Sequence, residues 1–100
     1  MSVMLEISVI PSGKEGASLS KIVAAAVDTA KEHGVKYMIG PMGTTLEGDL
    51  DTLLKIVREM HEVPFEMGFP RSQTIIKIDD RRDKELSMDY KVSAVQEKLS

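Results

Sequence analysis

The 100-residue sequence predicts one α+β domain, residues 1–100, with the order β-α-β-β-α-β and an additional C-terminal helix. Three observations support this prediction. Apolar residues alternate in two separate segments near the start and the end, which is typical of strands with one buried face. Two longer segments repeat apolar residues every three or four positions, as amphipathic helices do. Between these helical segments, residues 37–48 have the pattern of a β-hairpin.

Residues 2–10 form the first expected strand, because their apolar and polar positions alternate. Pro11, Gly13 and Gly16 indicate a loop directly after it. One side of the strand is wholly apolar, with Val3, Leu5, Ile7 and Val9, and the other side carries Met4, Glu6, Ser8 and Ile10.

The first helix is expected over residues 18–33. Ser18 is a suitable N-cap, and Gly34 is a suitable stop because glycine readily adopts the left-handed conformation that ends helices. Apolar residues between these two positions recur at helical spacing, at Leu19, Ile22, Val23, Ala26, Val27 and Ala30.

The hairpin has its arms at residues 35–39 and 43–47, with a turn at Gly40–Pro41–Met42–Gly43. Pro41 lacks an amide hydrogen and therefore marks the turn rather than the middle of a ladder. In the second arm Thr45 and Glu47 share one side, and Thr44 and Leu46 share the other.

The second helix is expected to begin after Asp49, which is a good N-cap, and to end at Pro64. Residues 64–70 then form a loop that holds both phenylalanines, Phe65 and Phe69. These rings either cover the end of the core or belong to a flap or a subunit contact.

The last strand is expected over residues 73–80, and a third helix is expected after Ser87. In the strand Ile75, Lys77 and Asp79 share one side, opposite Thr74, Ile76 and Ile78. The apolar stripe of the third helix is narrow, so this helix needs to dock on the body or on a neighbour.

This order of elements predicts the ferredoxin-like arrangement, a four-stranded antiparallel sheet with two crossover helices on one face. The first strand is then central, between the third and the fourth. The side of the sheet without helices combines apolar residues, with Tyr37 or Ile39 among them, and polar residues. The polar group consists of Glu6, Ser8, Thr45, Glu47, Lys77 and Asp79.

Composition argues against several functions. The net charge of −3 and the aromatic content of 4% do not suit a nucleic-acid or anionic-lipid partner. The sequence contains no cysteine, which excludes disulfides and thiol nucleophiles and fits a cytoplasmic location. Glu6 interrupts the apolar residues at the start, so neither a signal peptide nor a membrane span is expected.

Other chemistries have weaker support. Lys14 lies in a loop with two glycines, but the spacing differs from that of phosphate-binding loops. His33 and His61 fit surface positions near helix ends better than a metal site. The charged residues 79–84 fit a solvated strand end with local ion pairs, although an arginine there could also anchor a ligand. No arrangement of nucleophile and base is evident, so an enzyme using Asp79 or Glu47 as general base is the weakest hypothesis.

Three separated motifs stand out: SVIPSG at residues 8–13, PMGTTLEGDLD at residues 41–51 and TIIKIDDRRDK at residues 74–84. Together they resemble the thiamine-binding protein family of small ferredoxin-like proteins. The resemblance covers essentially the whole chain. It implies a ferredoxin-like protomer with an extra C-terminal helix, assembled as a homodimer or as a homotetramer that is a dimer of dimers. It also implies a ligand pocket lined by sheet residues near the subunit interface.

The expected ligand-binding residues have two origins. The family motif supplies Gly43, Thr44, Thr45 and Glu47, and the sheet geometry adds Ser8, Lys77 and Asp79. The main hypothesis is non-catalytic binding of a small heterocycle, thiamine or its hydroxymethylpyrimidine moiety, with no cofactor or metal. Glu47 or Glu6 would then accept a hydrogen bond from the aminopyrimidine or face the thiazolium charge. The alternative is a structural or regulatory oligomerisation domain whose uncovered side is only an interface.

Overall fold

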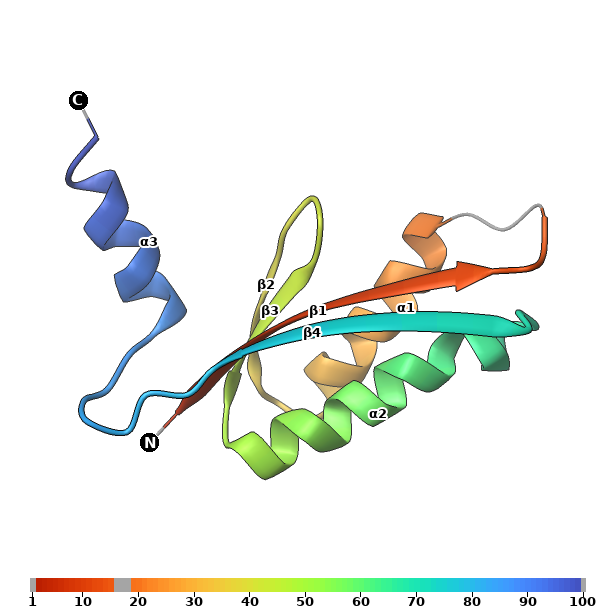
Figure 1. Cartoon of the computed structure of the whole chain (residues 1–100), viewed down its shortest axis with the longest axis horizontal. Helices are drawn as coiled ribbons and strands as arrows, with labels where there is room; N and C mark the ends of the chain where they lie inside the picture. The colour runs from red at the N-terminus through yellow and green to blue at the C-terminus, as the bar shows by residue number, and fades with distance from the viewer. Residues whose placement is uncertain (1, 16–18, 100) are drawn as a thin grey trace.

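The computed structural model describes residues 2–15 and 19–99. Its elements confirm the predicted order and the ferredoxin-like fold (Figure 1). They are β1 (Val3–Ser12), α1 (Leu19–Glu32), β2 (Lys36–Ile39), β3 (Thr44–Gly48), α2 (Leu50–Glu66), β4 (Arg71–Asp79) and α3 (Met88–Gln96).

The four strands form one antiparallel sheet in the order β2-β3-β1-β4. The first strand is central, as predicted, and pairs with β4 along nine residues but with β3 only from Val3 to Ile7. Figure 1 shows α1 and α2 on the same face of this sheet. The opposite face has neither of these helices against it.

Local sequence signals explain where the helices begin and end. The Asp49 carboxylate accepts a hydrogen bond from the Thr52 amide at 3.2 Å, and the Ser87 hydroxyl accepts one from the Tyr90 amide at 3.1 Å. Both contacts satisfy amides that the first turn of a helix leaves free. Gly34 follows α1 with φ +72°, the left-handed conformation expected of a helix stop. The predicted N-cap Ser18 lies outside the described residues.

Two prolines are placed differently from the prediction. Pro64 lies inside α2, which continues to Glu66, and Pro11 lies inside β1, which continues to Ser12. Pro64 stands in the last turn, where the missing amide hydrogen removes only one late helical bond. Pro11 pairs with Ser72 of β4 at a level where β3 has already ended, so one side of β1 needs no ladder bond there.

The hydrophobic core lies between the sheet and the two helices. Leu5, Leu46, Leu53 and Ile56 have no exposed surface and come from four positions on β1, β3 and α2. Phe69 belongs to this core, whereas Phe65 is exposed and packs edge-on against His61. The two phenylalanines of the predicted loop therefore differ, because one covers the core and the other faces outward.

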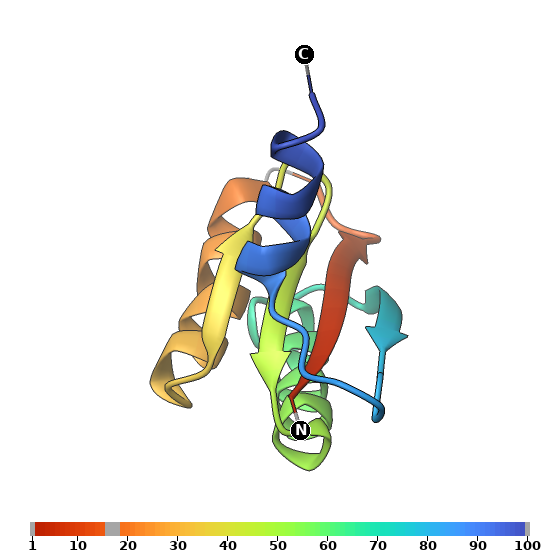
Figure 2. The ribbon, with the colours of Figure 1, turned by 90° about the vertical axis from the view of Figure 1, so that its left-hand side faces the viewer.

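The third helix stands apart from this core. Figures 1 and 2 show α3 on the side of the sheet away from α1 and α2, and in Figure 2 it lies in front of β2 and β3. Met88 at its start is buried, but Tyr90, Val92 and Val95 are exposed. Among the helices of residues 2–15 and 19–99, none has the length and apolar character needed to cross a membrane.

Candidate functional site

The face of the sheet without α1 and α2, here called the uncovered face, carries side chains in rows across the strands. In an antiparallel sheet, residues directly opposite one another project to the same side. The first row, the α3 row, contains Lys36, Glu47, Met4 and Asp79. The next row, the open row, contains Met38, Thr45, Glu6 and Lys77.

A third row follows beside the hairpin turn. Ser8 lies opposite Ile75 of β4, and Gly43 lies next to Ser8 on the other side. The structure thus brings six of the seven predicted binding residues onto one face. They are Ser8, Gly43, Thr45, Glu47, Lys77 and Asp79.

Thr44 does not join this group. It pairs with Ile7 and is buried on the helix-covered side, as the alternation along the strand requires. A ligand on the uncovered face would therefore not touch the Thr44 side chain, and the expectation that Thr44 lines the same pocket is corrected.

The hairpin register also corrects the sequence analysis. Tyr37 pairs with Leu46 and Ile39 pairs with Thr44, so both point toward the helices. Met38, opposite Thr45, is the apolar β2 residue on the uncovered face. A slip of one residue exchanges the two sides of a strand, and the turn geometry that sets the register was ambiguous in the sequence. The length of the turn was the signal that could have identified Met38. Four residues, 40–43, lie between the paired Ile39 and Thr44, and a loop with an even number of residues places an even-numbered residue opposite an odd-numbered one, so Thr45 faces Met38.

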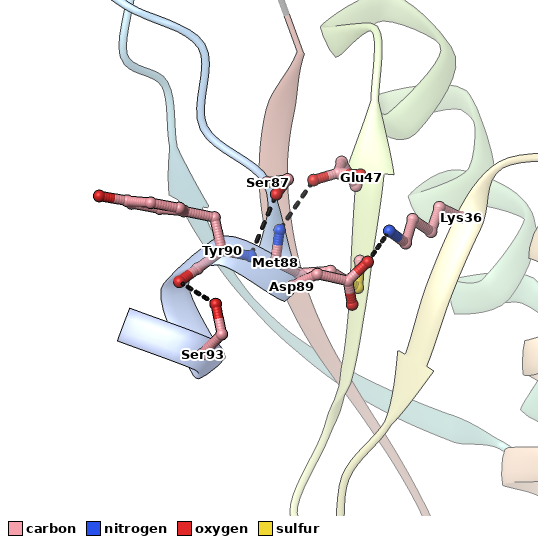
Figure 3. A network of polar contacts seen from close by, with 7 residues as sticks. All are labelled: Lys36, Glu47, Ser87, Met88, Asp89, Tyr90 and Ser93. Carbon is pink, nitrogen blue, oxygen red and sulfur yellow. Dashed lines mark hydrogen bonds and ion pairs between the residues drawn. The ribbon is translucent and has the colours of Figure 1, made fainter. Parts of the chain in front are cut away.

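Contacts with α3 use the polar groups of the α3 row (Figure 3). The Glu47 carboxylate accepts a hydrogen bond from the Met88 amide at 2.8 Å, at the first residue of α3. Lys36 forms an ion pair with Asp89, and Asp79 forms one with Lys91. Glu47 and Asp79 therefore hold α3 in this structure. Both were expected to bind the ligand, and neither is free to do so.

Local ion pairs shift the pKa values of several charged groups near the α3 row and after β4. The hydrogen bond to the Asp89 carboxylate raises the pKa of Lys36 above its usual value. Beyond β4, hydrogen bonds from Arg82 and Arg81 lower the pKa of Asp80 and of Asp83. All of these groups are well solvated, so the pairs add little stability. They match the local ion pairs predicted for residues 79–84.

The open row differs because its polar side chains are unused. Glu6 and Lys77 lie opposite one another on β1 and β4, and Thr45 lies on the other side of Glu6. Within the part of the chain that the structure describes, the three side chains have no hydrogen-bond or ion-pair partner. Met38 and Ile75 add exposed apolar surface beside them.

The close approach of Gly43 to β1 shapes the border of the open row. The Ser8 hydroxyl donates a hydrogen bond to the Met42 carbonyl at 2.9 Å, which ties the hairpin turn to the central strand. A Cβ atom at Gly43 would lie 3.2 Å from the Ser8 Oγ atom and 3.3 Å from the Glu6 Cγ atom. Such contacts are tight, so a residue without a side chain fits best at this position.

Two hollows in the single chain have no residue of the open row in their lining. One of about 490 Å³ lies between α3 and the segment after β4, with Arg81, Lys84, Leu86 and Tyr90 among its lining residues. Another, of about 330 Å³, lies near Val3, Asp49 and Arg82. Both are wide open to solvent. Asp79 and Lys91 beside the first hollow are paired with each other, and so are Asp80 and Arg82 beside the second. The polar side chains of the open row have no such partner among the described residues.

Other candidate residues have structural partners. The Lys14 ammonium donates a hydrogen bond to the Met67 carbonyl at 3.1 Å and lies over the Phe69 ring, so it ties two loops together. His33 contacts Glu59 at 2.6 Å and joins α1 to α2. His61 is half-buried and hydrogen-bonded to Thr74 at 2.6 Å, which links α2 to β4 and corrects its expected surface role.

The open row can provide a carboxylate acceptor, an ammonium donor and a hydroxyl within one small area. The flanking Met38 and Ile75 offer apolar contact for a ring. This combination suits a small heterocycle with an amino group or a positive charge, because such a ligand would pair with Glu6 and lay its ring on one of these two apolar residues.

Comparisons with known proteins agree with this architecture. Residues 5–96 match the family model described as thiamine-binding protein. A UPF0045 protein of Methanothermobacter thermautotrophicus is 46% identical over 95 residues, which cover 94% of this chain and 96% of that protein. A UPF0045 protein of Staphylococcus xylosus is 42% identical over 101 residues, which cover 97% and 94% of the two chains.

Solved structures are similar over nearly the whole chain. A hypothetical protein of Methanocaldococcus jannaschii has a TM-score of 0.86 at 42% identity, and the match covers 96% of this chain and 97% of that one. A candidate thiamine biosynthesis or salvage protein of Thermotoga maritima has a TM-score of 0.79 at 25% identity, with 95% and 99% covered.

Proposed function

Because the chain belongs to the thiamine-binding protein family, we propose that it binds thiamine or the hydroxymethylpyrimidine moiety of thiamine on its uncovered face. The observation that carries this proposal is the open row, in which Glu6, Thr45 and Lys77 are unpaired among the described residues and lie next to apolar side chains. The likeness to the Thermotoga maritima protein also supports it.

In this proposal Glu6 replaces Glu47 as the main recognition residue. Its carboxylate accepts a hydrogen bond from the exocyclic amino group of the pyrimidine, or faces the thiazolium charge. Thr45 and Ser8 contribute hydroxyl groups at the border. The ring lies against Ile75, which is opposite Ser8 and next to Lys77 on β4, and removes its exposed apolar surface from water.

We propose further that binding is non-catalytic and that the protein acts as a homodimer or homotetramer. The family name describes binding. Glu47 and Asp79, the two carboxylates considered as general bases, are held by contacts with α3. The open row is a surface rather than a pocket in one chain, and a ligand gains affinity when a second surface covers it.

Isothermal titration calorimetry with thiamine, and separately with hydroxymethylpyrimidine, tests the proposal. We expect the wild type to bind and Glu6→Gln to bind roughly tenfold or more weakly, as one lost charge-assisted hydrogen bond predicts. Glu62→Gln, which changes an exposed glutamate on α2, is the matched control and should bind like the wild type. Absence of binding by the wild type, or equal affinity of Glu6→Gln, contradicts the proposal.

A second candidate is an oligomerisation domain without a ligand. The exposed apolar residues of β4 and α3 favour it, because large apolar groups are commonly covered by a partner. It predicts a stable oligomer that gives no heat with either compound. The same titration, combined with a measurement of mass in solution, therefore separates the two candidates.

A further inference from the structure

The open row contains two opposite charges that are neighbours but do not neutralise each other. Glu6 and Lys77 lie directly opposite one another on β1 and β4, where the two Cβ atoms of such a pair are about 5 Å apart. Both side chains are exposed, and neither has a hydrogen-bond or ion-pair partner in the part of the chain that the structure describes. A small ligand on this face therefore meets a free carboxylate and a free ammonium group side by side.

Other positive charges on this face are paired or distant. The two lysines at the contact with α3 are paired with carboxylates, Lys36 with Asp89 and Lys91 with Asp79. Arg71 is unpaired among the described residues, but it lies six positions before Lys77 on β4, about 20 Å away. On the described strands, Lys77 is therefore the unpaired positive charge closest to Glu6.

Ile75 and Ser8 complete a square of four side chains with this pair. They lie opposite one another, two residues further along β4 and β1. Ile75 is 56% exposed, and the Ser8 hydroxyl is already used in its hydrogen bond to the Met42 carbonyl. A flat ring that rests on Ile75 thus has Lys77 beside it on the same strand and Glu6 diagonally across.

The chemistry of the pyrimidine fits two neighbouring charges of opposite sign. Hydroxymethylpyrimidine carries its amino group and its hydroxymethyl group on adjacent ring carbons. When the amino group donates a hydrogen bond to Glu6, the hydroxymethyl group can face Lys77. A phosphate ester of this hydroxyl then places its anionic oxygens at the ammonium group, and hydrogen bonds between charged groups are the stronger ones. Glu6 repels the phosphate, but over a longer distance than the direct contact with Lys77.

Thiamine has the opposite charge at this position. Its methylene carbon joins the pyrimidine to the positively charged thiazolium, in the place where the phosphate ester carries a negative group. The same orientation of the ring therefore brings the thiazolium charge toward the Lys77 ammonium group, and like charges at this range repel. Thiamine gains nothing from Lys77, whereas the phosphate ester gains an ionic contact.

We propose that Lys77 makes this surface selective for a phosphate ester of the pyrimidine, over the free alcohol and over thiamine. This inference rests on the proposed function and decides between its two ligand candidates. Glu6 binds the amino group, Lys77 binds the phosphate, and Ile75 supports the ring. The ligand class is an aminopyrimidine that carries an anionic group on the ring carbon next to its amino group.

Isothermal titration calorimetry with four compounds tests the selectivity. They are hydroxymethylpyrimidine, its monophosphate, thiamine and thiamine monophosphate. We expect the pyrimidine monophosphate to bind about tenfold or more tightly than the alcohol, as one charge-assisted hydrogen bond predicts. Thiamine monophosphate should bind no more tightly than thiamine, because its phosphate lies at the far end of the thiazolium. Inorganic phosphate should not displace the pyrimidine monophosphate at equal concentration.

Three variants assign the selectivity to Lys77. Lys77→Gln should bind the ester and the alcohol equally, and its affinity for the alcohol should stay within about twofold of the wild type. Lys77→Arg should keep the preference, because a guanidinium also binds phosphate. Lys55→Gln makes the same charge change at an exposed lysine of α2 and is the matched control. Added salt should weaken the preference of the wild type and leave Lys77→Gln unaffected.

Equal affinity of the wild type for the ester and the alcohol overturns this inference but leaves the proposed function standing, since the pyrimidine still binds. The inference is also overturned if Lys77→Gln keeps the preference, or if thiamine binds as tightly as the ester. Displacement of the ester by equal inorganic phosphate overturns it too, because the surface then binds an anion without the ring. If the wild type binds none of the four organic compounds, the proposed function fails, and this inference fails with it.

Discussion

The two faces of the sheet share the same strands but have different environments. On the face covered by α1 and α2, Leu5 and Leu46 lie against Leu53 and Ile56, and none of the four has any exposed surface. On the uncovered face, Ile10 and Ile75 are exposed beside polar groups without partners. One chain therefore completes its own core but leaves the other face to a ligand, to a second copy or to both.

The largest expected contrast between the faces concerns stability. Leu53→Ala removes a fully buried side chain and should lower the free energy of unfolding by about 2–5 kcal/mol. Ile75→Ala, measured at low protein concentration, should cost less than about 1 kcal/mol. Urea unfolding followed by circular dichroism compares the two variants. Similar losses would mean that the uncovered face is as well packed as the core.

A smaller effect is expected where the hairpin turn meets the uncovered face. Gly43→Ala places a methyl group against the Ser8 hydroxyl and should cost about 1 kcal/mol, while disrupting the Ser8 bond to Met42. Thiamine affinity should fall as well. Gly48→Ala is the control, because its Cβ would meet Leu53 and Val35 at ordinary distances of 3.5 and 3.6 Å. If Gly43→Ala bound thiamine with unchanged affinity, the contact between Gly43 and Ser8 would not be part of the binding site.

Detachment of α3 should be a local effect. Glu47→Ala removes the acceptor of the Met88 amide, and the opening of α3 should become easier by about 1 kcal/mol, roughly fivefold in exchange rate. Hydrogen exchange of residues 88–92 measures this change, with core amides as the internal reference. Glu97→Ala at the other end of α3 should leave these residues unaffected, and equal exchange in both variants would contradict the tethering role of Glu47.

The smallest effect concerns the ion pairs after β4. The hydrogen bond from Arg82 lowers the folded-state pKa of Asp80 below its ordinary 3.8. Its contribution is therefore present above this value and is lost as the pH falls through the lowered pKa. In an NMR titration, Arg82→Gln should raise the Asp80 pKa toward 3.8, and Arg58→Gln should not change it. Because the pair is exposed, thermal stability at neutral pH should stay the same.

Much of the fold followed from local patterns in the sequence. Alternation placed Glu6, Lys77 and Thr45 on one side, and cap residues such as Asp49 and Ser87 set the helix starts. The hairpin register was harder to predict from the sequence. Tyr37 or Ile39 was therefore expected on the uncovered face, where the structure places Met38. Pro64 was expected to end α2, yet the last turn accommodates it because few later hydrogen bonds depend on its position.

The sequence by itself determined the order of the elements and the two sides of each strand, because hydrophobic periodicity is a property of neighbouring residues. The tertiary structure decided which polar groups are free. Glu47 and Asp79 are used by α3, whereas Glu6 and Lys77 are not, and this difference arises from contacts between segments about 10 to 40 residues apart in the chain. Local sequence patterns do not predict such contacts, because the contacts depend on where α3 lies after the chain has left β4.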